Sequence, residues 1–196
     1  MSLNKKNSNS NLDLEKIKSL LGKERYQHTK MVLKSALKLA KKLGLDLTKV
    51  ETAALLHDIA KSKRDFELKE IIKDSRWEPD QLELEIEPVL HAPAGAVMAE
   101  ELFGVTDLEI LEAIRFHTLG HPEMGKIAQV IYAADFISED RNFDGLDGIR
   151  SEIESNFYFG LYLITTHIFR YQLEKNNFIH PYSNDLRNKL LKKRSD

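Results

Sequence analysis

The chain has 196 residues, and its 29 lysines and arginines against 31 aspartates and glutamates give a formal net charge of −2. That length suits one domain with a sizeable core, and the charge lacks the basic excess of proteins that grip polymeric nucleic acid by its phosphates. The sequence contains no cysteine. Disulfides, thiolate metal sites and cysteine nucleophiles are therefore excluded, and a transition-metal site would have to use histidine and carboxylate ligands.

The two ends of the chain have a polar composition. Residues 1–11 are rich in Asn, Ser and Lys and lack the apolar segment of a signal peptide, so they predict a disordered leader before a single domain at 12–196. No apolar run approaches the roughly 20 residues that span a bilayer. We therefore expect no contact with a membrane and a cytoplasmic protein. The basic residues after Leu186 indicate a solvated helix end rather than a binding patch.

Apolar residues recur with helical spacing along most of the chain, which predicts an all-α fold. The first predicted helix, 24–43, ends before Gly44, a residue typical of a helix C-terminus. Thr48, with Glu51 three residues later, predicts the capping box of a second helix that continues through Ala60. Further helices are predicted at about 89–103, 106–117, 123–138 and 146–174, with an extended loop at 74–88 and a turn-rich break at 142–148.

Ionisable residues lie on the apolar faces of these helices. Asp135 shares a face with Ala128 and Ile131, and His28 and His117 also lie on apolar stripes. A buried carboxylate must be paired, protonated or bound to a metal, because leaving it unpaired costs several kcal/mol. A single such residue is more often a structural ion pair or a satisfied core histidine, so the hypothesis of a metal site depends on the whole set.

Two further segments complete that set. His91 begins an Ala/Gly-rich helix, where small residues such as Gly95 allow a close approach to a neighbouring backbone. His57 and Asp58 lie together in the apolar second helix. Neighbouring side chains on a helix point roughly 100° apart, so two adjacent ions bridged by Asp58 suit this pair better than one ion does.

This order of residues resembles that of the HD-domain metal phosphohydrolases, and most closely their YqeK-like branch of bacterial symmetrical diadenosine tetraphosphate hydrolases. The resemblance covers about residues 14–174. It rests on five segments: Arg25-Tyr26-Gln27-His28, Ala54-Leu55-Leu56-His57-Asp58-Ile59-Ala60-Lys61, His91-Ala92-Pro93-Ala94-Gly95-Ala96, His117-Thr118-Leu119-Gly120 and Ala134-Asp135.

The resemblance implies an HD-domain helical bundle with a dinuclear metal site, a homodimer, and cleavage of diadenosine tetraphosphate into two ADP. Iron is the expected metal, with manganese or another divalent ion as alternatives, because histidine and carboxylate ligands without sulfur suit these ions. The expected ligands are His28, His57 and Asp135 for one ion and His91 and His117 for the other, with Asp58 between the two ions.

The resemblance also implies residues that contact substrate. We expect Asp58, Lys61 and Arg141 to take part in catalysis, and Lys61 and Arg141 to hold phosphates as well. Thr118, Gly120 and His121 are the other expected substrate contacts. The family has Thr-Thr-Gly-Arg after the fourth histidine and Tyr-Ile-Glu-Pro-x-Arg after the last aspartate. Leu119, His121 and Ser138 depart from those patterns, which leaves the nucleotide open.

Three alternatives follow from these patterns. The same metal site in a nucleotidase, or in another dinucleoside polyphosphatase, would act on a different nucleotide. A regulatory module that binds nucleotide without a metal would lack some of the six ligands, and all six are present in the sequence. A plain helical scaffold would have to place several histidines and aspartates on apolar faces by coincidence.

Overall fold

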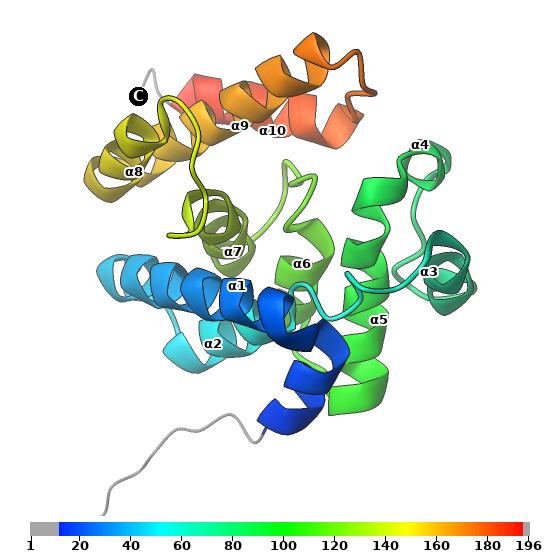
Figure 1. The fold of residues 1–196 in the computed structure, drawn as a ribbon. Helices are drawn as coiled ribbons and strands as arrows, with labels where there is room; N and C mark the ends of the chain where they lie inside the picture. Colours follow the sequence, from blue (N-terminus) through cyan, green and yellow to red (C-terminus); the bar gives the residue numbers. More distant parts are fainter. Residues whose placement is uncertain (1–11, 194–196) are drawn as a thin grey trace, which may run out of the picture.

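A computed structural model describes residues 12–193 and shows the expected all-α architecture (Figure 1). This part of the chain contains helices and no strands, and the expected leader at 1–11 lies outside it. None of its helices is both long and apolar enough to cross a membrane. The helices are α1 (Leu14–Leu43), α2 (Leu47–Leu56), α3 (Asp65–Ile72), α4 (Gln81–Glu85), the 3₁₀ helix η1 (Glu87–Val89), α5 (His91–Phe103), α6 (Leu108–Phe116), α7 (Lys126–Ile137), α8 (Leu146–Ser155), α9 (Phe157–Glu174) and α10 (Pro181–Lys193).

Helix α1 crosses the middle of the bundle and packs against α2 and α7 (Figure 1). Helices α8, α9 and α10 lie together on one side, and α3, α4 and α5 lie on another. The apolar side chains of α1, α2, α5, α6 and α7 share one buried core. Helices α5 and α7 are apolar nearly all round because they are covered on several sides.

Capping explains where the first two helices begin and end. Gly44 ends α1 with a left-handed φ of 66°, as predicted. The predicted start of the second helix at Thr48 is wrong: its N-cap is Asp46, whose carboxylate accepts hydrogen bonds from the backbone N–H groups of Thr48 (2.8 Å) and Lys49 (3.2 Å). One side chain thereby satisfies two free donors of the first turn. Helix α1 also begins earlier than predicted and is kinked at Gly22, where φ is 72°.

The end of α2 corrects a prediction that matters for the site. The α-helix ends at Leu56, and tight turns with i→i+3 hydrogen bonds follow, among them Ile59 N–H to Leu56 O (3.2 Å) and Lys61 N–H to Asp58 O (2.8 Å). His57 and Asp58 therefore do not stand on a regular helix. The two side chains are not held about 100° apart as predicted for neighbours on a helix, and both face the same centre.

The segment predicted as an extended loop contains α4 and η1 instead. Asp80 caps α4 in a reciprocal capping box with Glu83. Glu83 is fully buried and its Oε2 accepts a hydrogen bond from Arg115 Nη2 at 2.6 Å. Glu83, between Leu82 and Leu84, thus points inward because the buried Arg115 neutralises it. The alternation of acids and apolar residues in this segment therefore does not mark a strand.

Two more boundaries differ from the sequence prediction. The predicted helix 146–174 is two helices, because the Asn156 side chain accepts a hydrogen bond from Phe159 N–H (3.1 Å) and starts α9. Helix α10 begins at Pro181 and buries Leu186 and Leu190. Its basic last turn is exposed, as expected of a solvated helix end.

Gly120→Ala should destabilise the protein. Gly120 has a φ of 69°, and an added methyl group would clash with Cδ2 of the buried Leu186 on α10. The matched control is Gly104→Ala, at a φ of 65° with no neighbour within 4 Å of the methyl group. Both carry the cost of left-handed backbone, so the difference isolates overpacking. We expect urea unfolding to show a free energy of unfolding lower by about 1–3 kcal/mol in Gly120→Ala than in Gly104→Ala. Equal values would contradict the close approach.

Candidate metal centre

Five parts of the fold bring the six expected metal ligands together. His28 lies on α1, the His57-Asp58 pair on the turn after α2, and His91 is the first residue of α5. His117 follows α6, and Asp135 lies in the last turn of α7. The small residue Gly95 allows the close approach predicted for it. A methyl group there would lie 3.2 Å from Ile114 Cγ2 and 3.4 Å from the His57 carbonyl oxygen, so α5 packs directly on the turn.

Three of the histidines share one orientation. In each, Nδ1 lies 2.7–2.8 Å from the backbone carbonyl oxygen three residues earlier. A carbonyl oxygen only accepts, so each Nδ1 carries the proton and each Nε2 presents a lone pair. Metal-binding histidines commonly donate their second ring N–H in this way, which fixes the tautomer and the ring direction. The pairs are His57 with Ala54, His91 with Pro88, and His117 with Ile114.

The three Nε2 atoms converge on Asp58. Oδ1 of Asp58 is 3.3 Å from His91 Nε2 and 3.5 Å from His117 Nε2, and Oδ2 is 3.5 Å from His57 Nε2. The Nε2 atoms of His91 and His117 lie only 3.0 Å apart. His57 Nε2 is buried and has no hydrogen-bond partner. Lone pairs and a carboxylate pointing at one another repel, and divalent cations bound beside Asp58 would relieve this repulsion. The residues therefore fit a metal.

His28 extends this cluster toward α7. Its Nε2 is 3.0 Å from Asp135 Oδ1, and its Nδ1 is 2.7 Å from Asp140 Oδ2. Asp140 thus holds the ring from behind, as an outer carboxylate does for a metal-binding histidine. Burial opposes the charged form of His28, but these two carboxylates outweigh it and raise its pKa.

The ligand atoms form two candidate ion groups, in each of which all atoms lie within 4.8 Å of one another. One group is His28, His57 and Asp58, and the other is Asp58, His91 and His117. Asp58 is common to both, and Asp135 adjoins the first group through His28.

Three of the candidate ligands, His57, His91 and Asp58, have the protonation states that metal binding needs. Burial lowers the pKa of His91 to about 4 and lowers the pKa of His57 as well, so both rings are neutral at neutral pH. Burial works against ionisation of Asp58, but the surrounding histidines, His57 foremost, hold its pKa well below the usual range. The centre therefore presents neutral imidazoles at His57 and His91 and an ionised carboxylate at Asp58.

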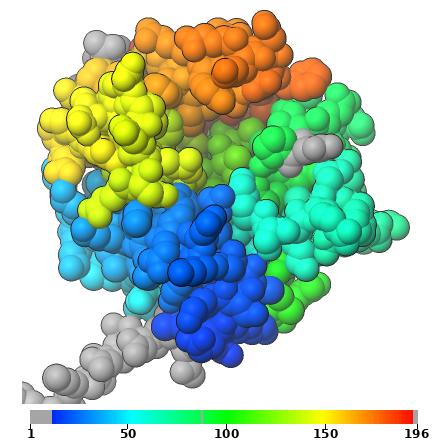
Figure 2. All heavy atoms as spheres, in the orientation of Figure 1, coloured from blue at the N-terminus to red at the C-terminus, as the bar shows by residue number. Residues whose placement is uncertain are grey.

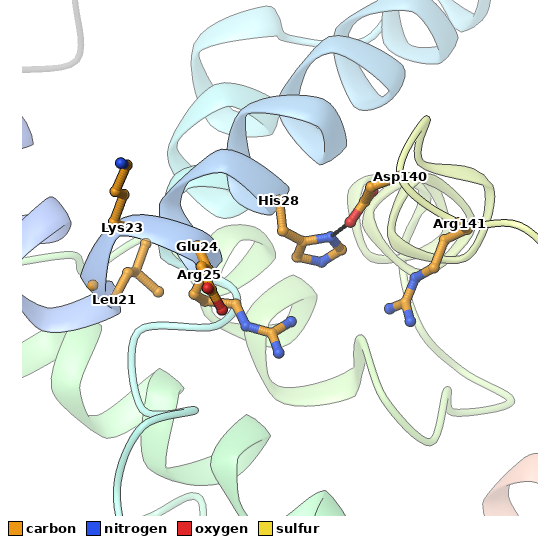
Figure 3. Close-up of a pocket in the computed structure, with 8 residues that line it drawn as sticks. Leu21, Lys23, Glu24, Arg25, His28, Asp140 and Arg141 are labelled. Atoms are coloured by element: carbon orange, nitrogen blue, oxygen red, sulfur yellow. Dashed lines mark hydrogen bonds and ion pairs between the residues drawn. The ribbon is translucent and has the colours of Figure 1, made fainter.

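Three cations surround the cluster. Arg25 Nη1 donates to Asp58 Oδ2 at 3.1 Å, and Arg141 Nη2 donates to Asp135 Oδ1 at 2.8 Å. Lys61 Nζ lies 3.1 Å from His91 Nδ1, and burial lowers its pKa. Arg25 and Arg141 line a cavity of about 580 Å³ beside the centre, into which both side chains point from opposite walls (Figure 3). This arrangement suits an anionic ligand held next to the metals.

Two residues of this site, Arg25 and Asp140, have no role predicted from the sequence. Arg25 belongs to a segment that carries the family resemblance and lies three residues before His28, on the same face of α1. Asp140 follows Asp135 by five residues, directly before Arg141. Their spacing from known candidates was a usable signal, but only the fold shows that they contact Asp58 and His28.

Of the other expected substrate contacts, Thr118 lies at the centre. Its Oγ1 is 3.1 Å from His117 Nε2 and 3.2 Å from His91 Nε2. Gly120 instead packs against α10, as described above, and its N–H caps α6 through Phe116 O (2.8 Å).

The structure does not bring His121 to the cluster. Its ring stacks on Phe116, with 4.7 Å between centroids, and meets Tyr182 edge-on at 4.6 Å. Its Nδ1 accepts a hydrogen bond from Glu123 N–H at 3.1 Å. These contacts explain the position of His121 through packing between α6 and α10.

A helical bundle that encloses a histidine–aspartate centre ringed by cations is typical of metal-dependent phosphohydrolases. The HD domain family matches residues 25–140, more than half of the chain. This chain therefore belongs to the HD domain family, and it is an HD-domain phosphohydrolase, as the sequence predicts.

Individual relatives agree with this assignment. The "Bis(5'-nucleosyl)-tetraphosphatase, symmetrical" of Halalkalibacterium halodurans is 35% identical over 178 residues, which are 91% of this chain and 95% of that protein. The protein of the same name from Bacillus subtilis is 38% identical over 166 residues, 84% of this chain and 88% of that one. A crystal structure of a "predicted HD superfamily hydrolase involved in NAD metabolism" from Clostridium acetobutylicum superposes with a TM-score of 0.87 at 30% identity, covering 93% of this chain and 98% of that one.

Proposed function

We propose that this phosphohydrolase cleaves diadenosine tetraphosphate symmetrically into two ADP at a dinuclear metal site. The observation that carries the proposal is the position of Asp58, which belongs to both candidate ion groups. Support comes from the two relatives named symmetrical tetraphosphatases, each of which this chain covers over most of its length.

His28, His57 and Asp135 would hold one ion, and His91 and His117 the other, with Asp58 between them. Held there, such ions would supply Lewis-acid chemistry for the attack of water on a phosphate. The side chains around them would orient the substrate: Lys61 and Arg141 contact phosphate oxygens, and Thr118 offers a hydroxyl beside His117. Burial of the centre strengthens these charge contacts, because they act away from bulk water.

Three finer points remain our predictions. Iron is the proposed metal, because neutral imidazoles and carboxylates without sulfur suit first-row ions, and manganese or another divalent ion would fit the same ligands. We also predict a homodimer and a cytoplasmic location.

A nucleotidase is the second candidate. It is favoured by the position of His121, which packs between Phe116 and Tyr182 and leaves the segment after His117 with one fewer phosphate contact than expected. A regulatory module without a metal is less favoured, because the fold brings all six ligands together at one buried centre.

Product identity separates these functions. Metal-loaded protein should convert diadenosine tetraphosphate to ADP alone, measured by chromatography of the products. AMP with ATP would mean asymmetric attack and would contradict the proposed binding frame. Release of phosphate from a mononucleotide, without turnover of the dinucleotide, would establish the nucleotidase instead.

Mutation of Lys61 and Arg141 tests their proposed contacts with phosphate. Lys61→Met and Arg141→Met should each lower kcat/KM by roughly 10- to 1000-fold, as expected for a charge contact that strengthens in the transition state. Metal content should stay unchanged. The matched control is Lys63→Met, which removes a neighbouring cation that pairs with Glu67 at 3.5 Å, away from the ligands. Wild-type rates for both Lys61→Met and Arg141→Met would place the phosphate path elsewhere.

A further inference from the structure

A second cavity, which we call the side cavity, lies between the α4–α5 connection and the α9–α10 connection. Its volume is about 560 Å³, within the range of ligand pockets of roughly 300–1,000 Å³. Figure 1 shows the α9–α10 connection on the side of the molecule that carries α4. Two hydrogen bonds fix these walls: His180 Nε2 to Asp80 Oδ2 (2.9 Å) and Ser183 Oγ to Leu119 O (2.8 Å). The cavity is therefore held open by the fold.

The side cavity reaches the metal centre through Thr118. This residue lines the cavity, and its Oγ1 lies within 3.2 Å of the Nε2 atoms of two metal ligands, His91 and His117. Thr118 and Ile168 also line a smaller hollow of about 200 Å³ that contains His117, Asp135 and Arg141. A ligand in the side cavity would thus have its anionic end at the metals.

The chemistry of the side cavity differs from that of the cavity beside Arg25. The cavity beside Arg25 has charged walls, which include Arg25 and Arg141 (Figure 3). In the side cavity, aliphatic residues such as Ile86, Ile168 and Ile179 form part of the walls, and polar residues, among them Glu85, His180 and three amides, form the rest. The space-filling view, drawn in the orientation of Figure 1, shows a hollow between the blue α1, the yellow α7–α8 connection and the orange α9 (Figure 2). Phosphates suit the first cavity, and a flat apolar group suits the second.

Specific side chains in the side cavity suit a purine base. Gln172 Oε1 accepts a hydrogen bond from Asn177 Nδ2 at 2.8 Å, which leaves the Gln172 amide donors and the Asn177 amide acceptor for a ligand. Amides of this kind recognise the adjacent donor and acceptor on the edge of adenine. Phe178 is 61% exposed at the rim of the cavity, so its ring face is accessible for a planar ligand to stack on.

We propose that the side cavity binds the base and ribose of one half of the substrate, an inference that rests on the proposed hydrolysis of a dinucleoside polyphosphate. The base stacks on Phe178 and meets the amides of Gln172 and Asn177. Its phosphates pass Thr118 to the metals, and the phosphates of the other half continue toward Arg25 and Arg141. The side cavity would thus hold the nucleoside on one side of the bond that is cleaved. The cavity beside Arg25 would hold phosphates on the other side of that bond.

The test compares ADP binding and catalysis in three variants of the metal-loaded protein. Phe178→Ala should weaken ADP binding, measured by calorimetry, by about 5- to 100-fold, the range for loss of one base–aromatic stack. It should raise KM for diadenosine tetraphosphate by a similar factor and leave kcat and metal content unchanged. Phe178→Trp should keep wild-type affinity, because it retains the stack. Phe66→Ala, which removes an aromatic side chain on α3 that is 57% exposed, is the matched control and should behave as wild type.

The outcomes separate this inference from the proposed function. If the wild type cleaves diadenosine tetraphosphate and Phe178→Ala binds ADP equally well, the function stands and the assignment of the side cavity is overturned. A drop in kcat or metal content with unchanged ADP affinity would also overturn it, because that would show a structural role. If the wild type neither binds ADP nor cleaves the dinucleotide, the proposed function itself fails and the inference falls with it.

Discussion

Asp58→Asn should abolish hydrolysis, with a loss of kcat/KM of roughly 1000-fold or more. Removal of an outer-shell partner of a metal ligand costs about 10- to 100-fold, and Asp58 is a direct candidate ligand in both ion groups. Asparagine keeps the size of the side chain but removes the negative charge on which three lone pairs converge. Elemental analysis should find less than one ion per chain in the variant, compared with one to two in the wild type.

Asp140→Asn is the graded comparison for this result. Asp140 contacts His28 Nδ1 at 2.7 Å from outside the cluster, so its loss should lower activity by only about 10- to 100-fold. Circular dichroism should show that both variants remain helical. Equal activity losses in the two variants, or full metal content in Asp58→Asn, would show that Asp58 does not bridge the ions.

The candidate ligands stand out in the sequence for a physical reason. Histidine and aspartate are costly on an apolar helix face, so His28, His117 and Asp135 stand out against the helical period without any structure. The same period predicts the all-α fold. Asp140 and Arg25 do not stand out, because they lie where charged residues are common and only the fold brings them to His28 and Asp58.

Errors in the sequence prediction arose where local and tertiary effects compete. The pattern through Ala60 continues the apolar face of α2, but the backbone turns after Leu56 to aim two ligands at one centre. At Glu83 the alternation of acids and leucines resembles a strand. The segment is a helix instead, and the acid is buried because Arg115, on a helix distant in sequence, neutralises it. Neither effect can be read from a window of neighbouring residues.

Metal removal should lower stability as well as activity. The candidate ligands come from five separate parts of the fold, so an ion that binds them links elements that an unfolded chain cannot hold together. At a free metal concentration 100 times the dissociation constant, one ion adds about 2.7 kcal/mol to the free energy of unfolding. For a chain of this size, that corresponds to a rise in Tm of about 5–10 °C per ion.

The metal-free protein should nevertheless remain folded, because Arg25 pairs with Asp58 and Arg141 pairs with Asp135. Each buried carboxylate then keeps a cationic partner. Calorimetry of the protein with excess manganese and with a chelator measures the shift in Tm. In Asp58→Asn the shift should largely disappear, whereas Lys63→Met should retain it. A wild-type Tm that does not respond to iron, manganese or chelator would mean that this centre holds no structural metal, and the proposed dinuclear site would be wrong.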